Sequence, residues 1–421
     1  MGITTNIRKI GSGFKPSFWI ANIMELFERI AYYGQATILS IFLRDHLKFN
    51  EVETGQLSSI FGGLIYFLPI FAGALADRFG FRKAFSFAFF VLALGYFMIG
   101  ATGMAAFSGI FSSSHLFWVL IVILVFTAIG GSFIKPSVLG TVALSSSAET
   151  KSIGYAIYYW LVNIGGALGP LIAFFVRRQM GIQAVYIVSA VSCFLMFLNT
   201  IFFYKEPVSN IDRSQVSISM VFKNLLRVLV NFRFMIFLLI FSLYWLMFWQ
   251  IFVIIPFFIT DYISKDAPFE IIQSVGSWGI ILFQLIVNWF TKRLSPITAI
   301  ITGFSVSALC WFIIMMNPTI PIIIAGLFVM SLGEMTQAPR YYEYIADLAP
   351  EGQAALFQGY AFLPVAIGWT LGGTLGGWLY KVFATDSKQP QMIFLVLFGV
   401  GLAAAVLMFI YNLTIRSKKR V

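Results

Sequence analysis

Long apolar runs recur along the whole chain, and they limit the folds that it can adopt. About twelve runs contain roughly twenty residues or more, the length at which an α-helix crosses the ~30 Å hydrocarbon core of a bilayer. They lie near 17–43, 54–76, 82–103, 116–143, 152–177, 184–204, 234–261, 270–291, 297–316, 320–347, 354–381 and 391–415. Charged residues make up 11% of the chain, against roughly 25% in soluble domains. We therefore predict an all-α membrane protein, since the sequence lacks the short alternating segments of transmembrane β-strands.

The placement of Lys and Arg predicts the orientation in the membrane. With an even number of spans, both termini lie on one side, and that side holds eighteen Lys and Arg against seven on the other. Cytoplasmic loops carry the excess of these residues, so we expect cytoplasmic termini in a multi-pass protein of the bacterial inner membrane. We expect no cleavable signal peptide. The net charge of +11 follows from the loop bias, and no basic patch interleaved with aromatic residues indicates a nucleic acid partner.

The most polar stretch lies between the sixth and seventh runs and divides the chain. It predicts an N-terminal six-helix bundle at 1–204, a cytoplasmic linker at 205–233 and a C-terminal six-helix bundle at 234–421. Within the linker, residues 219–231 have the pattern of a surface helix with Lys223 and Arg227 on one face.

Twelve spans in two halves resemble the major facilitator superfamily, whose fold places two six-helix bundles around a central cavity. The loop from Gly73 to Lys83 resembles the cytoplasmic loop motif of that superfamily, through Asp77, Arg78 and the flanking glycines. The resemblance implies that Asp77 and Arg78 are gating residues, whose charge-assisted contacts hold the cytoplasmic side shut. The alternative is a plain basic loop.

Three charged residues in the first apolar run, Glu25, Glu28 and Arg29, are the least expected residues of the sequence. A charge in the hydrocarbon core costs at least about 2.5 kcal/mol on insertion scales. Spacings of three and four residues place these side chains on one helical face, together with Tyr32 and Tyr33. We predict that this face looks into a polar cavity.

Two further runs carry a charge beside a helix breaker. Lys135 precedes Pro136 in the fourth run, and Glu334 lies between Gly333 and Pro339 in the tenth. The breakers predict bent helices with free backbone carbonyls next to the cavity. We predict that Lys135 and Glu334 pair across the bundle and separate during gating. The alternative is a fixed structural pair.

Residues in the second, fifth and seventh runs are weaker candidates for the cavity. Tyr66, Asn163, Trp245 and Gln250 carry groups that bind solutes, but each alone is more typical of helix packing. The two cysteines lie in apolar runs and are interpreted as packing thiols. Because no metal-ligand cluster and no nucleophile–base set is visible, we expect no metal, no cofactor and no enzymatic activity.

Taken together, these elements resemble the proton-dependent oligopeptide transporter (POT, or PTR) family of the same superfamily. The resemblance suggests a divergent member with twelve helices. The matching motifs, in chain order, are Glu25-x-x-Glu28-Arg29 with Tyr32-Tyr33-Gly34, Lys135-Pro136, Tyr159-x-x-x-Asn163-x-Gly165, Trp245 with Gln250, and Gly333-Glu334 with Pro339 and Ala349-Pro350.

The resemblance implies a role for each of these residues. Lys135 would receive the carboxylate of a peptide, with Arg29 close by, and Glu334 would receive its amino group. Proton coupling would involve Glu25, Glu28, Arg29 and Glu334. The substrate-binding residues would be Arg29, Tyr32, Tyr33, Tyr66, Lys135, Asn163, Trp245, Gln250 and Glu334. Lys135 and Glu334 would also act in gating.

The chain departs from the family pattern at two linked positions. Ala36 stands where members usually have an arginine, and Trp249 stands where they often have a carboxylate. These two residues would form a gate pair between the halves, and losing both leaves no charge buried alone. The other departures are Gly276, Ala361, Arg340, Tyr341 and Glu343. The second half of the site is therefore altered more than the first.

We expect a proton-coupled symporter of di- and tripeptides or peptide-like zwitterions that works by alternating access. Its partners would be the solute, protons and membrane lipid, and we expect a monomer. Two alternatives stay open: a transporter of another small anionic or zwitterionic solute, including an exporter, and a receptor that transports nothing. Buried charges are costly to keep without use, which argues against the receptor.

Overall fold

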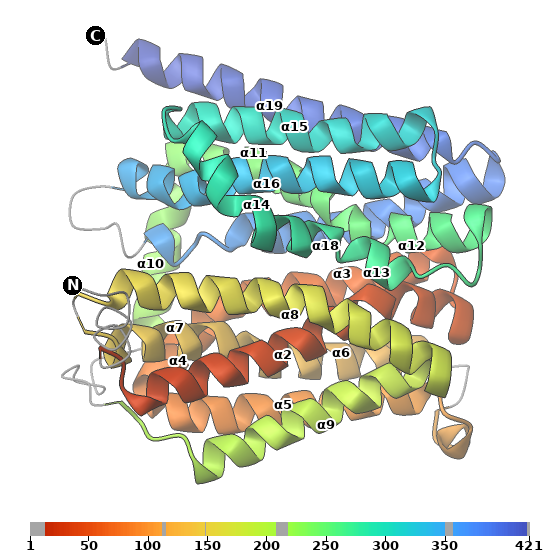
Figure 1. Cartoon of the computed structure of the whole chain (residues 1–421), viewed down its shortest axis with the longest axis horizontal. Coiled ribbons are helices and arrows are strands. Elements are labelled where there is room, and N and C mark those ends of the chain that lie inside the picture. Colours follow the sequence, from red (N-terminus) through yellow and green to blue (C-terminus); the bar gives the residue numbers. More distant parts are fainter. Residues whose placement is uncertain (1–12, 112–114, 148, 208–217, 350–356, 419–421) are drawn as a thin grey trace, which may run out of the picture. The chain divides into compact units, whose positions relative to one another are not determined.

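The computed structural model describes residues 13–111, 115–147, 149–207, 218–349 and 357–418 (Figure 1). Within these ranges the chain is helical apart from turns and one isolated bridge between Phe14 and Ser146. The prediction of an all-α protein is confirmed. Pro350 of the tenth-run motif and residues 208–217 of the predicted linker lie outside the described residues.

Close packing divides the chain into two compact units. Unit 1 comprises 1–35 and 68–222, and unit 2 comprises 36–67 and 223–421. The division falls within the first helix, so the end of that helix and the next one pack with the second half of the sequence. Residues 36–67 therefore belong to unit 2, although in sequence they lie among the first six runs.

Unit 1 contains long helices that follow one another with short connections. Within it, α5 lies beside both α6 and α9. Its helices are α2 (Pro16–Ile41, up to Gln35), α4 (Pro69–Phe79), α5 (Phe81–Thr102), η2 (Ala105–Phe107), α6 (Leu116–Ser132), α7 (Ile134–Ser145), α8 (Lys151–Met180) and α9 (Ile182–Phe202). The helix predicted over 219–231 is α10 (Ile218–Val230), which crosses the boundary between the two units, and its Lys223 and Arg227 are exposed.

Unit 2 contains the end of α2 and the remaining helices, several of which are broken. Within it, α15 lies beside α16 and α19, and α3 lies against α18. Its elements are η1 (Phe42–His46), α3 (Glu51–Phe67), α11 (Phe232–Phe248), η4 (Trp249–Phe252), α12 (Ile254–Phe258), η5 (Ile259–Ile263), α13 (Phe269–Gln273), α14 (Val275–Thr291), α15 (Pro296–Met316), α16 (Ile320–Leu348), α18 (Leu363–Leu379), η6 (Tyr380–Asp386) and α19 (Gln391–Lys418).

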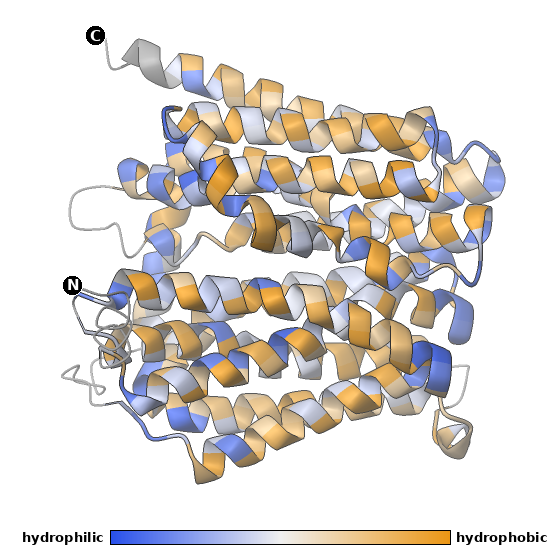
Figure 2. Ribbon diagram, viewed as in Figure 1, coloured by the Kyte–Doolittle hydropathy of each residue, from blue (hydrophilic) through white to orange (hydrophobic). Residues whose placement is uncertain are grey.

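Nine helices among the described residues are long and apolar enough to cross a membrane, or ten if the bent pair α3 and α4 forms one span. That pair bends by 43°, at a break where Pro69 opens the second helix without an N–H to donate. The first and eleventh predicted runs are also helical, but they are not among these helices. The helix α2 carries three charges in its centre, and α18 has only 17 residues. Figure 2 shows apolar residues along most helices and hydrophilic ones mainly at helix ends and in loops.

Small residues allow α3 and α18 to approach closely inside unit 2. A Cβ added to Gly55 would overlap the carbonyl oxygen of Gly373, and one added to Gly377 would overlap the backbone of Glu51. Ser59 Oγ then lies 3.0 Å from Thr374 Oγ1 across the contact. This is the packing of small residues that brings membrane helices together, and it joins α3 firmly to the second half of the chain.

Candidate functional site

Three charged side chains of α2 lie together in the interior of unit 1. Glu25 and Glu28 are fully buried, and Arg29 is 3% exposed. The Arg29 guanidinium pairs with Glu28 through Nε and Nη2, and its Nε lies 3.4 Å from Glu25 Oε1. The guanidinium also lies 4.8 Å from the centroid of the Tyr32 ring, a cation–π contact. One cation thus lies between two carboxylates and an aromatic ring.

Close packing of α2 on α8 holds this cluster in place. A Cβ added to Gly165 would overlap the Arg29 side chain, and one added to Gly169 would overlap the backbone of α2. The two glycines are four residues apart, the spacing that lets membrane helices approach closely. Larger residues here would push α2 away, so the glycines determine where the Arg29 side chain lies.

The two carboxylates of the cluster are incompletely hydrogen-bonded. Among the described residues, both oxygens of Glu25 and Oε1 of Glu28 accept no hydrogen bond. A buried carboxylate oxygen without a donor is costly. The cluster therefore keeps three oxygens that can still accept a hydrogen bond.

Lys135 joins the cluster from the broken fourth span. The helix breaks between α6 and α7 at Phe133, two residues before Lys135, as the sequence predicts. Lys135 is half-buried and interacts electrostatically with Arg29, Glu25 and Glu28. When all four groups are ionised, two positive and two negative charges cancel.

Two other predicted cavity residues lie in unit 1. Tyr33 is half-buried, with its ring edge-on to Tyr32 at 5.2 Å between centroids. Asn163 is 9% exposed, and its Nδ2 donates to the carbonyl of Tyr159 one turn earlier at 2.9 Å. That bond uses one of the two amide protons of Asn163, so the side chain can still donate a hydrogen bond to a solute.

Glu334 is half-buried in α16 of unit 2. Its carboxylate makes no hydrogen bond or ion pair with any residue that the structure describes. The helix α16 continues through Pro339 without a break, and a bend in this run stays a prediction. Pro339 has no N–H, so the carbonyl of Met335 lacks its usual donor within the helix. Gln284 Nε2 donates a hydrogen bond to that carbonyl at 3.1 Å. Lys135 lies in the other unit, so its pairing with Glu334 stays a prediction.

Aromatic rings gather around Trp249, where family members often have a carboxylate. The Trp249 ring lies 3.7 Å from Trp369, 5.5 Å from Trp245 and 5.8 Å from Tyr66 between centroids. Gln250 is fully buried, and its amide donates to a backbone carbonyl of α18 and to one of α11. The predicted substrate residues Tyr66 and Trp245 thus belong to an aromatic layer around Trp249, and Gln250 joins two helices.

The predicted gating residues Asp77 and Arg78 are exposed at the end of α4. Gly80 follows with a φ of 94°, which a glycine adopts without strain. The first two backbone N–H groups of α5 then donate to the carboxylate of Glu206, at 2.9 and 2.7 Å. An anion at a helix N-terminus is favourable, so Glu206 caps α5, a contact that the sequence did not indicate. The gating roles stay predictions.

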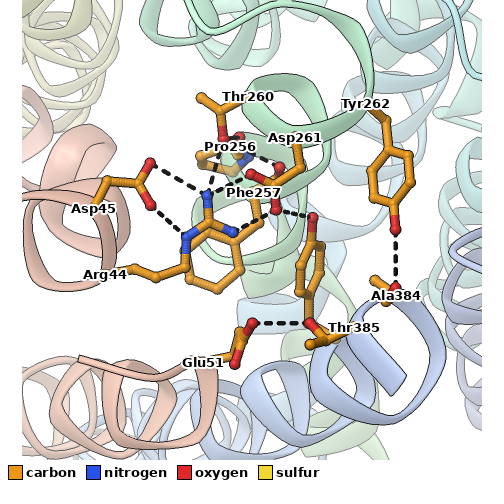
Figure 3. A network of polar contacts seen from close by, with 11 residues as sticks. Arg44, Asp45, Glu51, Pro256, Phe257, Thr260, Asp261, Tyr262, Ala384 and Thr385 are labelled. Carbon is orange, nitrogen blue, oxygen red and sulfur yellow. Dashed lines mark hydrogen bonds and ion pairs between the residues drawn. The ribbon is translucent and has the colours of Figure 1, made fainter. Parts of the chain in front are cut away.

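Sequence reasoning missed a polar network in unit 2 (Figure 3). There Arg44, which appears in the sequence as an ordinary loop charge, binds both carboxylate oxygens of Asp261. The signal was weak: Asp261 ends a long apolar run, and Arg44 follows another. A second missed residue is Glu270, a fully buried carboxylate one turn before Gln273 at the start of the eighth span.

Known proteins are similar in sequence to part or nearly all of this chain. Dipeptide and tripeptide permease A of Yersinia pestis is 27% identical over 218 residues, which cover 51% of this chain and 41% of the permease. The chain therefore spans less than half the length of the peptide permeases that it matches. Multidrug resistance protein MdtH of Proteus mirabilis is 21% identical over 403 residues, which cover 95% of this chain and 94% of that protein.

Solved structures share the fold at low sequence identity. A POT family transporter in complex with 5-aminolevulinic acid has a TM-score of 0.76 and 16% identity, over 94% of this chain and 96% of that one. A peptide transporter POT in complex with alafosfalin has a TM-score of 0.75 at 16% identity, over 93% of each chain. The predicted fold class is thereby confirmed. The sequence model of the Major Facilitator Superfamily matches residues 21–268 and 263–420, and the chain belongs to this superfamily.

Proposed function

We propose that this protein is a proton-coupled symporter of di- and tripeptides or peptide-like zwitterions that works by alternating access. The observation that carries the proposal is the buried cluster of α2, where Arg29 pairs with Glu25 and Glu28 while three carboxylate oxygens accept no hydrogen bond. The likeness to dipeptide and tripeptide permeases supports the choice of solute.

Charge balance links the peptide to the proton. With Glu25, Glu28, Arg29 and Lys135 ionised, the cluster is neutral. A peptide carboxylate that binds Lys135 or Arg29 adds one negative charge, and a proton on either glutamate restores neutrality. Because a net charge in a low-dielectric interior is costly, each of the two ligands favours binding of the other. Peptide and proton would therefore move together.

The amino group of the peptide needs a negative partner away from the carboxylate. Glu334 is half-buried and has no ionic partner among the described residues, so its charge is available. Tyr66 and Trp245 would contact the peptide side chains, and the aromatic layer around Trp249 favours apolar ones. In unit 1, Tyr32, Tyr33 and Asn163 would line the site, and Gln250 would support it from unit 2.

The proposal includes the predicted organisation of the chain. Two six-helix bundles at 1–204 and 234–421 would rock about the site, joined by the linker at 205–233, with both termini cytoplasmic. Asp77 and Arg78 would hold the cytoplasmic side shut. We propose a monomer in a bacterial inner membrane, with membrane lipid around it.

A second candidate function is transport of another small anionic or zwitterionic solute, including export. The match to a multidrug resistance protein along 95% of this chain supports it. Ala36 and Trp249 are neutral and stand where a charged gate pair is usual in the family, which also supports a different solute. A receptor without transport has less support, since it would not need charges buried in a membrane helix.

Uptake into proteoliposomes tests the proposal. We expect labelled dialanine to accumulate when an inward proton gradient is imposed and to equilibrate only slowly without it. Uptake that ignores the gradient would reject proton coupling. Gradient-driven movement of another solute, with no peptide uptake, would select the second candidate.

A variant of the cluster tests the coupling step itself. Glu28→Gln cannot release or take up a proton, so we expect it to lose gradient-driven uptake and to retain counterflow exchange of peptide. Glu343→Gln is the matched control, because Glu343 is half-exposed and pairs with Arg340. Full driven uptake by Glu28→Gln would remove this residue from the coupling mechanism.

A further inference from the structure

One side of α10 is exposed and carries an apolar strip next to a basic strip. The apolar strip consists of Leu226, Leu229 and Val230, which are 60%, 41% and 81% exposed. Helical periodicity places these side chains within about 100° of one another around the helix axis. Lys223 and Arg227 lie one turn apart along the edge of that strip, and both are exposed. All five residues belong to unit 2.

The basic strip is not neutralised by acidic side chains. The sequence contains no Asp or Glu between Asp212 and Asp261. Among the described residues, neither Lys223 nor Arg227 forms an ion pair. Two positive charges are therefore available to an anionic partner at the surface. The apolar strip beside them indicates that this partner has an apolar part as well.

A joint of one residue holds α10 at the level of the membrane surface. The helix ends at Val230, and α11 begins at Phe232 as part of a helix long and apolar enough to cross a membrane. Between them, the Asn231 N–H donates to the carbonyl of Val228 at 3.0 Å, and the Asn231 side chain accepts from the N–H of Phe234 at 3.1 Å. Because both helix ends are closed through the same residue, α10 stays close to the point where the seventh span enters the bilayer.

The end of unit 2 that carries α10 is also the end at which α19 finishes. Tyr411, in the last turns of α19, donates its hydroxyl to the carbonyl of Arg233 in the first turn of α11 at 3.1 Å. These turns and α10 lie at the same end of unit 2 (Figure 1). In the proposed orientation this end faces the cytoplasm, and the cytoplasmic leaflet carries the anionic lipid headgroups.

We propose that α10 binds the anionic lipid headgroups of the cytoplasmic leaflet. Leu226, Leu229 and Val230 enter the boundary between headgroups and acyl chains, while Lys223 and Arg227 pair with the phosphate groups. A basic amphipathic helix binds at this depth through its buried apolar area and its attraction to anionic lipid. A soluble acidic protein could pair with the two charges, but it would have to displace lipid from an apolar strip next to a membrane span.

Binding of α10 also gives the lipid a means to act on transport, and this consequence rests on the proposed function. The one-residue joint connects α10 to α11, which carries the proposed substrate residue Trp245. A helix held in the leaflet restricts how the cytoplasmic end of α11 can shift while the two bundles rock. We therefore expect the transport rate to depend on the anionic lipid content of the membrane.

Quenching of a fluorescent label by lipid tests the binding without any substrate. The reporter is Leu226→Cys carrying an NBD fluorophore, in the full chain with its two native cysteines replaced by serine. The protein is placed in nanodiscs of phosphatidylcholine, or of phosphatidylcholine and phosphatidylglycerol in equal parts, with nitroxide-labelled lipid in both. Each basic residue near an anionic surface favours binding about fivefold, so we expect the ratio of quenched to unquenched label to rise at least about tenfold with phosphatidylglycerol. The same label at Met220, which is exposed on the other side of the basic strip, should be quenched less.

Matched double variants show whether the basic strip causes the increase in quenching. We expect Lys223→Gln with Arg227→Gln to lose the increase, and Lys223→Arg with Arg227→Lys to keep it. Lys292→Gln with Arg293→Gln removes two exposed charges at the end of α14 in the same unit and should also keep it. Equal quenching in both nanodiscs, or an increase that survives the loss of Lys223 and Arg227, would overturn the proposal. A label that lipid quenches in neither nanodisc would overturn it too and would select a soluble acidic partner.

Uptake into proteoliposomes of the same two compositions tests the consequence for transport. We expect gradient-driven uptake of labelled dialanine by the parent protein to be several-fold faster with phosphatidylglycerol, and uptake by Lys223→Gln with Arg227→Gln to be equal in both. Quenching that follows the lipid charge, in a protein that takes up no peptide, would support the lipid site and reject the peptide as solute. Driven peptide uptake together with quenching that ignores the lipid charge would do the reverse.

Discussion

The balance of charges around Arg29 makes a quantitative prediction. Arg29→Met removes the only guanidinium among the described residues that pairs with the fully buried Glu25 and Glu28. Breaking a buried pair by deleting one partner costs about 3–5 kcal/mol, because the other charge is left uncompensated. Lys135 remains, so the cluster of the variant carries one net negative charge.

A second substitution should restore most of the free energy of unfolding that Arg29→Met loses. Adding Glu28→Gln to Arg29→Met leaves Glu25 and Lys135, whose charges cancel again. Glu28→Gln alone leaves one net positive charge and should cost about 1–3 kcal/mol. Simple addition predicts roughly 4–8 kcal/mol for the double variant, whereas charge balance predicts a loss smaller than that of Arg29→Met alone. The coupling free energy between the sites should therefore be at least about 2 kcal/mol.

Thermal unfolding of the purified protein in detergent measures the order of the variants. We expect Arg29→Met to lower Tm by on the order of 10 °C, and the double variant to recover at least half of that. Arg29→Lys keeps the charge and controls for it, while Glu334→Gln controls for a carboxylate that has no ionic partner among the described residues. A double variant as unstable as Arg29→Met, or less stable, would refute the charge-balance reasoning.

Four further predictions follow from single contacts. Lys135→Ala and Glu334→Ala should each lower dipeptide uptake into proteoliposomes by about tenfold or more, and wild-type rates in both would remove these charges from the mechanism. Gln284→Leu leaves a buried carbonyl of α16 without its donor and should cost about 1–3 kcal/mol, seen as a lower Tm. Glu206→Ala removes the cap of α5 and should cost about 1 kcal/mol, and an unchanged Tm would contradict that role. Gly169→Leu should lower Tm strongly by separating α2 from α8, whereas a mild effect would show that the two helices can adjust.

Local patterns in the sequence were sufficient to predict the helices and the ion cluster of the first span. Span length and apolar composition predict membrane helices because the bilayer sets one thickness for all of them. Helical periodicity places Glu25, Glu28 and Arg29 on one face, and the structure brings them together as an ion cluster. The break before Lys135 was also predictable, since Gly and Pro act through the backbone of their own helix.

Pairings between distant helices were decided by the tertiary structure. Arg44 and Asp261 are 217 residues apart, and neither residue carries a local sign of the other. The same holds for the Gln284 amide that fills the carbonyl freed by Pro339, and for the Trp249 and Trp369 rings. Local periodicity determines which face of a helix is polar, because neighbouring residues share one backbone. Which partner that face meets depends on how whole helices pack, and that is why residues 36–67 could be assigned to the second half only from the structure.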